Sequence, residues 1–413
     1  MKFCEIDNPW QIPIRAIINP KFNQTFAIAM TDFGSLDIFD GIPAGSAHFL
    51  EHKLFAKPHY DSAQRFAQAG ASSNAFTTYT KTAYLFKTVT NVADNLEILL
   101  DLISQPYFTT VNVAQERGII AQEIQMYTDM PDWIVEQATL AALYPQDAID
   151  FDIAGTTDSI AQITAPVLNQ IYTHYYLPQN FCIYLAGKVD LAEINAKLQT
   201  LADHNHHLQM FAQRHGRPQL HQNPHLLPVV PQTTLRTIAQ RPRFMLGLRL
   251  IPTIKQSCAM ITLQNQLEFL FAIILGDSSK IHQTLVRRGL IDDSFGYTII
   301  VERYYALVLI SGESDQPQVV AHSLENYLFQ GAFISELTRA NLQMVQRENL
   351  GSYVFLQDYL ENLATEAVEL AFYDLDVRQM PQILQQIQLR DLKQLAEEIF
   401  KKENWTQTFL YPQ

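Results

Sequence analysis

The segments "SSNAFTTYT" (72–80) and "TAYLFKTVT" (82–90) predict paired or bent β-strands, because they are rich in Thr, Tyr and Phe and only Lys81 separates them. A second pair, "SFGYTIIV" (294–301) and "YALVLISGE" (305–313), follows in the other half of the chain. In both halves a strand and helices precede the pair, and several helices follow it. This repeated order predicts an α+β fold of two homologous domains, each a mainly antiparallel sheet with helices packed on one face.

Length and charge narrow the class of protein. The chain has 413 residues and is 47% hydrophobic, which predicts a globular protein of more than one domain. Its formal net charge is −13, and lysine and arginine are scattered along the sequence. Phosphates would be repelled without a concentrated basic patch, so we expect no nucleic-acid partner.

Targeting signals and cysteine spacing point to a cytoplasmic protein. The first twenty residues contain no uninterrupted apolar segment and do not resemble a signal peptide. The longest apolar run, "LEFLFAIILG" (267–276), is half the length that a bilayer requires, so we expect no membrane span. Cys4, Cys182 and Cys258 match no zinc-ligand or redox spacing, which is typical of reduced thiols in the cytoplasm.

The segment "AHFLEH" (47–52) carries the strongest chemical signal, within a helix that we expect over 46–56. His48 and His52 are four residues apart, so their imidazoles share one helical face and can converge on one ion. A catalytic zinc requires three protein ligands and one open position for water. Glu51 can accept a proton from such a water and pass it to a leaving amine. The alternative is an ordinary solvated helix face.

A third ligand is available about seventy residues later. Glu116 and Glu123 are seven residues apart in "ERGIIAQEIQMYTDMPDW" (116–133) and share one face of a predicted helix. Residue spacing alone leaves open which of the two reaches the metal.

The segments "AHFLEHKLF" (47–55), "DIAGTTDSI" (152–160) and "GLIDDSF" (289–295) look most like the bacterial YmfH-type branch of the pitrilysin/insulinase family of zinc peptidases. Three segments together resemble that family, the inverzincins, as a whole. They are "AHFLEH" (47–52), "GASSNAFTTYTKTAYLF" (70–86) and "ERGIIAQEIQMYTDMPDW" (116–133). The resemblance implies one Zn²⁺ per chain, and it assigns a role to each polar residue of the motifs. The implied ligands are His48, His52 and Glu123, the implied general base is Glu51, and Glu116 is implied as the carboxylate that steadies the site.

The same resemblance implies how substrate and subunits are arranged. Asn74, Ala75 and Phe76 match the edge strand on which the family lays a peptide as an added β-strand. The implied fold is that of mitochondrial-processing-peptidase-like metallohydrolases, in which two homologous domains form half of a clam-shell chamber. We therefore expect a homodimer, or a heterodimer with a homologous subunit.

Domain boundaries follow from a change in composition. Residues 203–232 combine proline, glutamine and histidine without periodicity. We expect a catalytic zinc-binding domain over 1–205, a linker over 206–230 and a homologous non-catalytic domain over 231–413.

One departure from the family affects the expected function. The family's second domain usually offers an arginine and a tyrosine seven apart, which hold the scissile carbonyl and the substrate backbone. Here Arg287, Arg288 and Tyr297 are present, but Leu290 lies seven before the tyrosine and Phe295 seven after the second arginine.

We expect a zinc endopeptidase that hydrolyses peptides or small unfolded segments. The first alternative is a processing or scaffold subunit with an intact zinc site that acts only in a hetero-oligomer. The second is a non-catalytic interaction protein, in which the complete ligand set would have no use.

Overall fold

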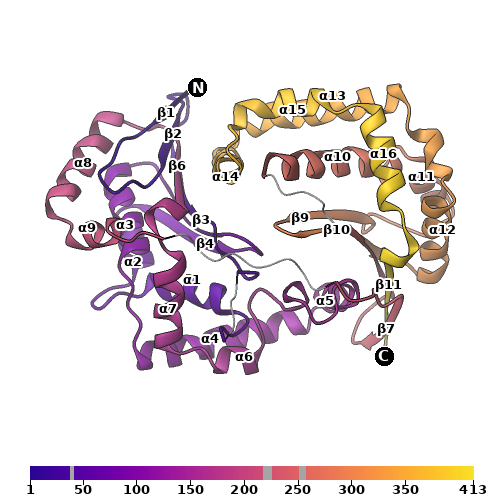
Figure 1. Cartoon of the computed structure of the whole chain (residues 1–413), viewed down its shortest axis with the longest axis horizontal. Coiled ribbons are helices and arrows are strands. Elements are labelled where there is room, and N and C mark those ends of the chain that lie inside the picture. Colours follow the sequence, from indigo (N-terminus) through magenta and orange to yellow (C-terminus); the bar gives the residue numbers. More distant parts are fainter. Residues whose placement is uncertain (38–40, 217–225, 251–256) are drawn as a thin grey trace. The chain divides into compact units, whose positions relative to one another are not determined.

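The computed structural model describes residues 1–37, 41–216, 226–250 and 257–413. The chain forms two compact units, and each unit takes segments from both halves of the sequence (Figure 1). The first unit contains Met1–Ile124, Asp152–His221 and Phe355–Val377, and the second contains Gln125–Phe151, Gln222–Val354 and Arg378–Gln413.

A six-stranded sheet, in the order β1-β2-β6-β3-β5-β4, organises the first unit. All neighbouring strands are antiparallel except β2 and β6, which are parallel. The strands are β1 (Lys2–Glu5), β2 (Ile14–Ile18), β3 (Thr25–Thr31), β4 (Ala71–Thr77), β5 (Thr82–Thr88) and β6 (Phe181–Gly187). The strand pair predicted around Lys81 is therefore confirmed as the hairpin β4–β5, and β4 lies at the edge of the sheet.

Helices from the first half of the chain cover one face of this sheet. They are α1 (Ser46–Phe55), α2 (Ser62–Gln68), α3 (Val92–Ser104), α4 (Thr110–Thr128), α6 (Thr157–Ala161), α7 (Ala165–Tyr175), α8 (Leu191–His204) and α9 (His206–Ala212). Local sequence explains both ends of α2. The Asp61 side chain accepts a hydrogen bond from the Ala63 amide at its start, and Gly70, with a φ of 82°, follows its end. Two short 3₁₀ helices, η1 (Ala148–Asp150) and η2 (Pro178–Asn180), occur in the same part of the sequence.

The opposite face of the first sheet is covered by a helix from the second half of the chain. Alternate residues of β3 point to opposite faces. Ala27 and Ala29 belong to the core cluster beneath α1 and α3, whereas Phe26 and Ile28 are also buried but face the other way. There α14 (Leu360–Ala371) packs on β3 and β6.

The second unit repeats this plan around a five-stranded sheet, in the order β7-β11-β8-β10-β9. Only β7 and β11 are parallel. Its strands are β7 (Gln232–Thr237), β8 (Arg243–Leu250), β9 (Gly296–Glu302), β10 (Tyr305–Glu313) and β11 (Trp405–Pro412). Its other helices are α10 (Ser257–Leu275), α11 (Lys280–Arg287), α12 (Pro317–Phe329), α13 (Arg339–Leu356), α15 (Met380–Gln386) and α16 (Leu389–Ile399), with 3₁₀ helices η3 (Ala332–Glu336), η4 (Val377–Gln379) and η5 (Lys402–Asn404) between elements. The predicted α+β fold of two homologous domains is confirmed.

The second sheet also receives a helix from the other half of the chain. In Figure 1 the purple α5 (Pro131–Leu143) lies beside β11, and it packs on β7, β8 and β11. The residues of β8 that face it include Gly247, where an added Cβ would lie 2.8 Å from Leu143 Cδ1 and 3.0 Å from Thr139 Cγ2. A glycine here lets helix and strand approach closely.

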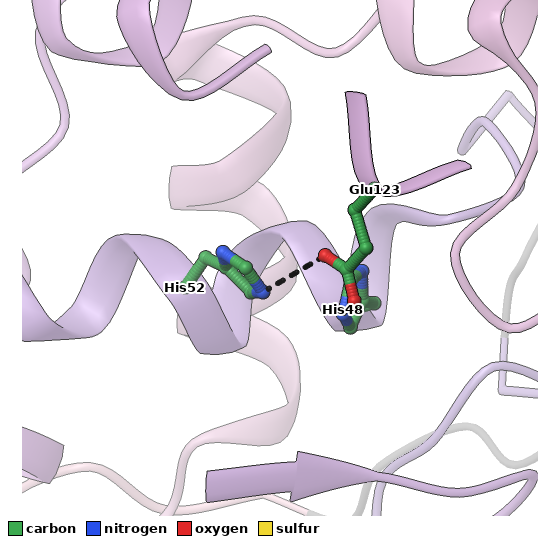
Figure 2. A group of neighbouring side chains, drawn as sticks. All are labelled: His48, His52 and Glu123. Atoms are coloured by element: carbon green, nitrogen blue, oxygen red, sulfur yellow. Dashed lines mark ion pairs between the residues drawn. The ribbon is translucent and has the colours of Figure 1, made fainter. Parts of the chain in front are cut away.

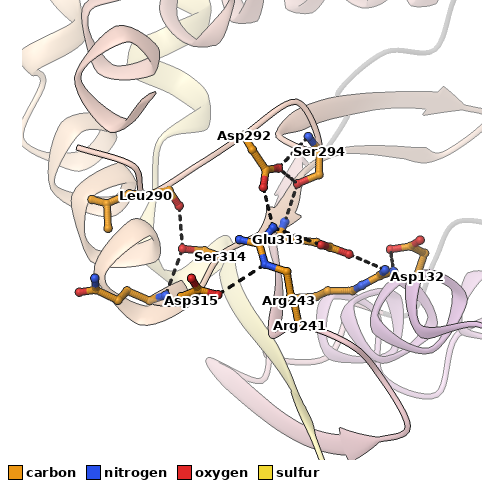
Figure 3. A network of polar contacts seen from close by, with 10 residues as sticks. Asp132, Arg241, Arg243, Leu290, Asp292, Ser294, Glu313, Ser314 and Asp315 are labelled. Carbon is orange, nitrogen blue, oxygen red and sulfur yellow. Dashed lines mark hydrogen bonds and ion pairs between the residues drawn. The ribbon is translucent and has the colours of Figure 1, made fainter. Parts of the chain in front are cut away.

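Arginines at the two ends of β8 hold the two ends of α5. Arg243 forms an ion pair with Asp132 in the first turn of the helix, and it also binds Glu313 at 2.6 Å (Figure 3). Arg249 donates to the carbonyl oxygen of Leu143, the last residue of the helix, at 2.8 Å. The carbonyl ends of a helix carry partial negative charge, so a cation is favourable at that end.

The sequence did not predict this exchange of helices. The expected division into 1–205, 206–230 and 231–413 is linear along the chain, whereas the compact units are not. In addition, α9 occupies the beginning of the segment expected to be a linker, and residues 217–225 lie outside the described part. No single helix of the described ranges is long and apolar enough to cross a membrane; by length and composition alone, the bent pair Ala259–Leu275 and Lys280–Arg287 would pass.

Candidate metal centre

The helix α1 places His48 and His52 side by side. It begins at Ser46 and buries Phe49, Leu50 and Leu54 in the core of the first unit, which fixes the direction of its polar face. The two imidazole rings project from that face with their centroids 4.6 Å apart.

Glu123 reaches the same point from α4 (Figure 2). Its Oε1 lies 3.8 Å from His48 Nε2, and its Oε2 lies 3.6 Å from His52 Nε2. One ligand atom from each of the three residues falls within 4.8 Å of the others. Ligand atoms about 2.0–2.1 Å from a tetrahedral zinc are roughly 3.3 Å apart, so this group fits a zinc ion after small adjustments of side-chain torsions.

Glu116 occupies a different position on α4. Its Oε1 lies 3.2 Å from His52 Nδ1, and its Oε2 accepts a hydrogen bond of 2.9 Å from Lys53 Nζ. A proton on Nδ1 of His52 would bond to this carboxylate and leave the Nε2 lone pair directed at Glu123. These contacts would suit Glu116 to orient a metal-binding histidine, as the sequence resemblance implied. No pattern in the sequence indicated its contact with Lys53.

The contact between His52 and Glu116 shifts the pKa of both side chains. Burial alone would lower the pKa of His52, but the hydrogen bond with Glu116 and nearby carboxylates outweigh it, so its pKa is raised. Burial would raise the pKa of Glu116, but its bonds to His52 and Lys53 outweigh that effect and lower its pKa. Each partner stabilises the charged form of the other.

His48 is held in the neutral form that binds metals. Burial, with a smaller contribution from His52, lowers the pKa of His48 to about 4. Its Nδ1 is buried and has no hydrogen-bond partner among the residues that the structure describes, while its Nε2 faces Glu123. A neutral imidazole that directs one nitrogen at a carboxylate and a second imidazole is suited to coordination.

Glu51 lies beside the ligands and touches the edge strand. Its side chain is buried, and its Oε2 accepts a hydrogen bond of 2.6 Å from the hydroxyl of Thr77, the last residue of β4. Burial raises the pKa of Glu51 to about 7, although the Thr77 bond opposes this. A carboxyl group with a pKa near neutrality can both accept and return a proton. Thr77 directly follows the predicted substrate-binding residues, but no pattern in the sequence indicated its contact with Glu51.

The expected substrate-binding residues lie on an exposed sheet edge. Asn74, Ala75 and Phe76 belong to β4, which pairs with β5 on one side and has no strand of the described chain on the other. Such an edge can add a peptide as a further strand.

In the second domain, two of the residues that the sequence offers in place of the arginine–tyrosine pair make contacts within their own unit. Arg287 donates to the carbonyl oxygen of Gln283 within its own helix α11. The ring of Tyr297 on β9 packs 5.9 Å from that of Phe271, and burial raises its pKa to about 12. Arg288 is the C-cap residue of α11.

Comparison with protein families gives two matches. The family described as insulinase (peptidase family M16) matches residues 34–157, which include the metal-site residues. The family described as peptidase M16 inactive domain matches residues 162–346.

Individual proteins of known sequence or structure are also similar to this chain over most of its length. The uncharacterized zinc protease YmfH of Bacillus subtilis is 30% identical over 386 residues, which cover 91% of this chain and 89% of that protein. An M16-like peptidase from Alicyclobacillus acidocaldarius has a crystal structure similar to this one, with a TM-score of 0.89, 25% identity and coverage of 100% and 98%. A protease from Helicobacter pylori shares the fold at a TM-score of 0.80 and 17% identity, over 100% of this chain and 99% of that one.

Proposed function

The chain belongs to the insulinase family of peptidases (peptidase family M16), in the branch that includes YmfH, and on that premise we propose that it is a zinc-dependent endopeptidase. The observation that carries the proposal is the convergence of His48, His52 and Glu123 beside the buried Glu51. The similarity to zinc proteases supports a metallopeptidase.

In this proposal each residue of the site has a separate task. His48, His52 and Glu123 hold the ion, and Glu116 orients His52 through Nδ1. Zinc bound there would act as a Lewis acid, which would polarise the scissile carbonyl and lower the pKa of a bound water molecule. Glu51 takes the proton of the attacking water and delivers it to the leaving amine.

The proposed substrate is an extended peptide or a short unfolded segment. Backbone hydrogen bonds along Asn74, Ala75 and Phe76 would align it as a strand next to β4. The last residue of β4, Thr77, is hydrogen-bonded to Glu51. A peptide paired with β4 would therefore lie close to the proposed general base. The finer proposal that cleavage takes place within a clam-shell chamber comes from the family resemblance.

Metal analysis and a peptide digest together test the proposal. The purified chain should contain one zinc and should cut unstructured peptides; Glu123→Ala should lose the metal, and Glu51→Gln should keep it but lose hydrolysis by orders of magnitude. Glu193→Ala, at an exposed glutamate on α8, is the matched control and should change neither property. Full zinc content in Glu123→Ala would contradict the ligand assignment, and turnover by Glu51→Gln would contradict the assigned base.

A second candidate is a subunit that cuts only with a homologous partner. It is favoured by the absence of the arginine–tyrosine spacing and by the involvement of Arg287 and Tyr297 in contacts within their own unit. Loss of one preorganised donor to a developing oxyanion costs about 100- to 1000-fold in rate. A partner that carries this pair would restore the donors.

Turnover with and without a partner distinguishes the two candidates. The chain should be assayed alone and then with homologous subunits, on the same peptides. A rate that rises by about 100-fold or more in a mixture supports the subunit. An isolated chain that cuts as fast as every mixture excludes it.

A further inference from the structure

Lys53 is a charged residue at a buried position beside the proposed metal site. It directly follows His52 on α1, and its side chain is only 4% exposed. Phe49 and Leu50 of the same helix are fully buried in the core of the first unit. An ammonium group loses its hydration at such a position, and this cost must be offset by an anion close by.

That anion is Glu116 on α4. Lys53 Nζ donates a hydrogen bond of 2.9 Å to Glu116 Oε2, and within the described ranges no other acidic side chain pairs with this lysine. The Glu116 side chain is itself 15% exposed. Both residues belong to the segment Met1–Ile124, so the ion pair lies within the first compact unit.

The two oxygen atoms of Glu116 have different partners. Oε2 accepts the bond from Lys53, whereas Oε1 lies 3.2 Å from His52 Nδ1. A carboxylate that is fixed through one oxygen by a charge-assisted hydrogen bond has little freedom to turn its other oxygen away. The lysine therefore limits the directions in which Glu116 can face. The nitrogen that it faces is the one His52 does not direct at Glu123.

Lys53 can act on the metal only through Glu116. Consecutive residues of a helix point in directions about 100° apart, so Lys53 does not share the face that carries His48 and His52. A lysine ammonium group also has no lone pair with which to bind a metal ion. Its contribution to the site must pass through the carboxylate that it holds.

We propose that Lys53 is a positioning residue of the metal centre, which fixes the Glu116 carboxylate so that this carboxylate orients His52 for zinc. The inference rests on the proposed function, because it requires the site to bind zinc. A residue that supports a metal ligand typically contributes about 10- to 100-fold to metal affinity. Lys53 should supply part of the contribution of Glu116.

Replacing Lys53 with methionine has two opposite effects on zinc affinity. Loss of the positive charge removes a repulsion of Zn²⁺ and favours binding. Loss of the bond to Oε2 frees the Glu116 carboxylate and weakens binding. Only the second effect requires Glu116, so a double-mutant cycle separates the two.

Zinc affinities of four full-length proteins complete this cycle. They are the wild type, Lys53→Met, Glu116→Gln and the double variant, each measured by chelator competition. Lys53→Met should weaken zinc binding by about 3- to 30-fold more in the wild-type background than in the Glu116→Gln background. The visible spectrum of the Co²⁺ form, which reports ligand geometry, should change with Lys53→Met only where Glu116 is present.

Lys57→Met is the matched control. Lys57 is a second buried lysine, 5% exposed, and its Nζ donates to the backbone carbonyls of Leu102 and Gln105 rather than to a carboxylate. The same substitution at this position should have equal effects on zinc affinity in both backgrounds and should leave the Co²⁺ spectrum unchanged.

The outcomes separate this inference from the proposed function. If Lys53→Met has equal effects in both backgrounds, or weakens binding more in the Glu116→Gln background, the inference is wrong, while zinc binding by the wild type leaves the proposed function intact. A wild-type chain that binds no zinc overturns both. If Lys53→Met fails to fold, Lys53→Gln takes its place in the same cycle, with the same expected difference between backgrounds.

Discussion

The Thr77 hydroxyl donates a 2.6 Å hydrogen bond to Glu51 Oε2, so the last residue of the edge strand touches the proposed general base. This contact joins two segments that are 26 residues apart in the sequence and that are expected to have different tasks. It means that the strand proposed to align the peptide also orients the carboxylate proposed to receive the proton.

Replacing Thr77 should therefore affect hydrolysis more than metal binding. Thr77→Val keeps the shape of the side chain but removes a bond to a carboxylate, which is worth about 1.5–3 kcal/mol. We expect kcat to fall by about tenfold or more with zinc content unchanged, and Thr77→Ser to restore most of the rate. Steady-state kinetics and metal analysis provide the measurement. A Thr77→Val enzyme with wild-type kcat would show that the bond has no role in orienting Glu51.

Substitutions of Glu116 and of Glu123 should weaken zinc binding to different extents. Changing a residue that orients a ligand typically costs about 10- to 100-fold in metal affinity. Glu116→Gln should consequently bind zinc more weakly but still with one ion per chain, whereas Glu123→Gln should lose more. Chelator competition on both variants gives the order. A larger loss in Glu116→Gln would identify Glu116 as the ligand.

Lys57 should make stability depend on pH in the alkaline range. Its Nζ donates to the carbonyl oxygens of Leu102 at 3.0 Å and Gln105 at 2.6 Å, and burial lowers its pKa to about 7. An unfolded lysine has a pKa of about 10.4, so between these values the unfolded chain binds more protons than the folded one. The free energy of unfolding should therefore rise from pH 7 to pH 10 by this contribution, on the order of a few kcal/mol.

Comparison with a variant isolates this contribution. Lys57→Met should lose the rise, whatever its stability at pH 7. Lys188→Met, at an exposed lysine, should keep the wild-type slope. Denaturant unfolding at several pH values is the measurement. Equal slopes in wild type and Lys57→Met would show that Lys57 keeps its proton throughout this range in the folded chain.

The end of α5 should contribute to the stability of the second unit. The buried Tyr144 hydroxyl donates to the carbonyl oxygen of Ala306 on β10 at 3.0 Å. Tyr144→Phe removes this bond and should lower the free energy of unfolding by about 1 kcal/mol. Tyr304→Phe, at a residue that is 38% exposed, should have a smaller effect. If both variants unfold at the wild-type denaturant concentration, the bond adds nothing to stability.

Local features of this molecule could be predicted from the sequence, because neighbouring residues alone decide them. Helical geometry puts His48 and His52 on one face wherever the helix packs. Asp61 and Gly70 mark the ends of α2 through bonds and backbone angles within a few residues. The strand pair around Lys81 follows from composition and spacing, and the repetition of this order gave the two-domain α+β fold.

Relations between distant segments were decided by the tertiary structure. Glu116 and Glu123 share one helical face, but seven residues correspond to about 10.5 Å along the helix axis. Only the offset of α4 against α1 determines that Glu123 lies near the Nε2 atoms of both histidines, whereas Glu116 lies near Nδ1 of His52. The exchange of α5 and α14 was likewise absent from the sequence pattern, because an apolar helix face does not specify which sheet will bury it. The packing of α5 on β8 depends on close contact between Gly247 and Leu143, which are more than a hundred residues apart in the chain.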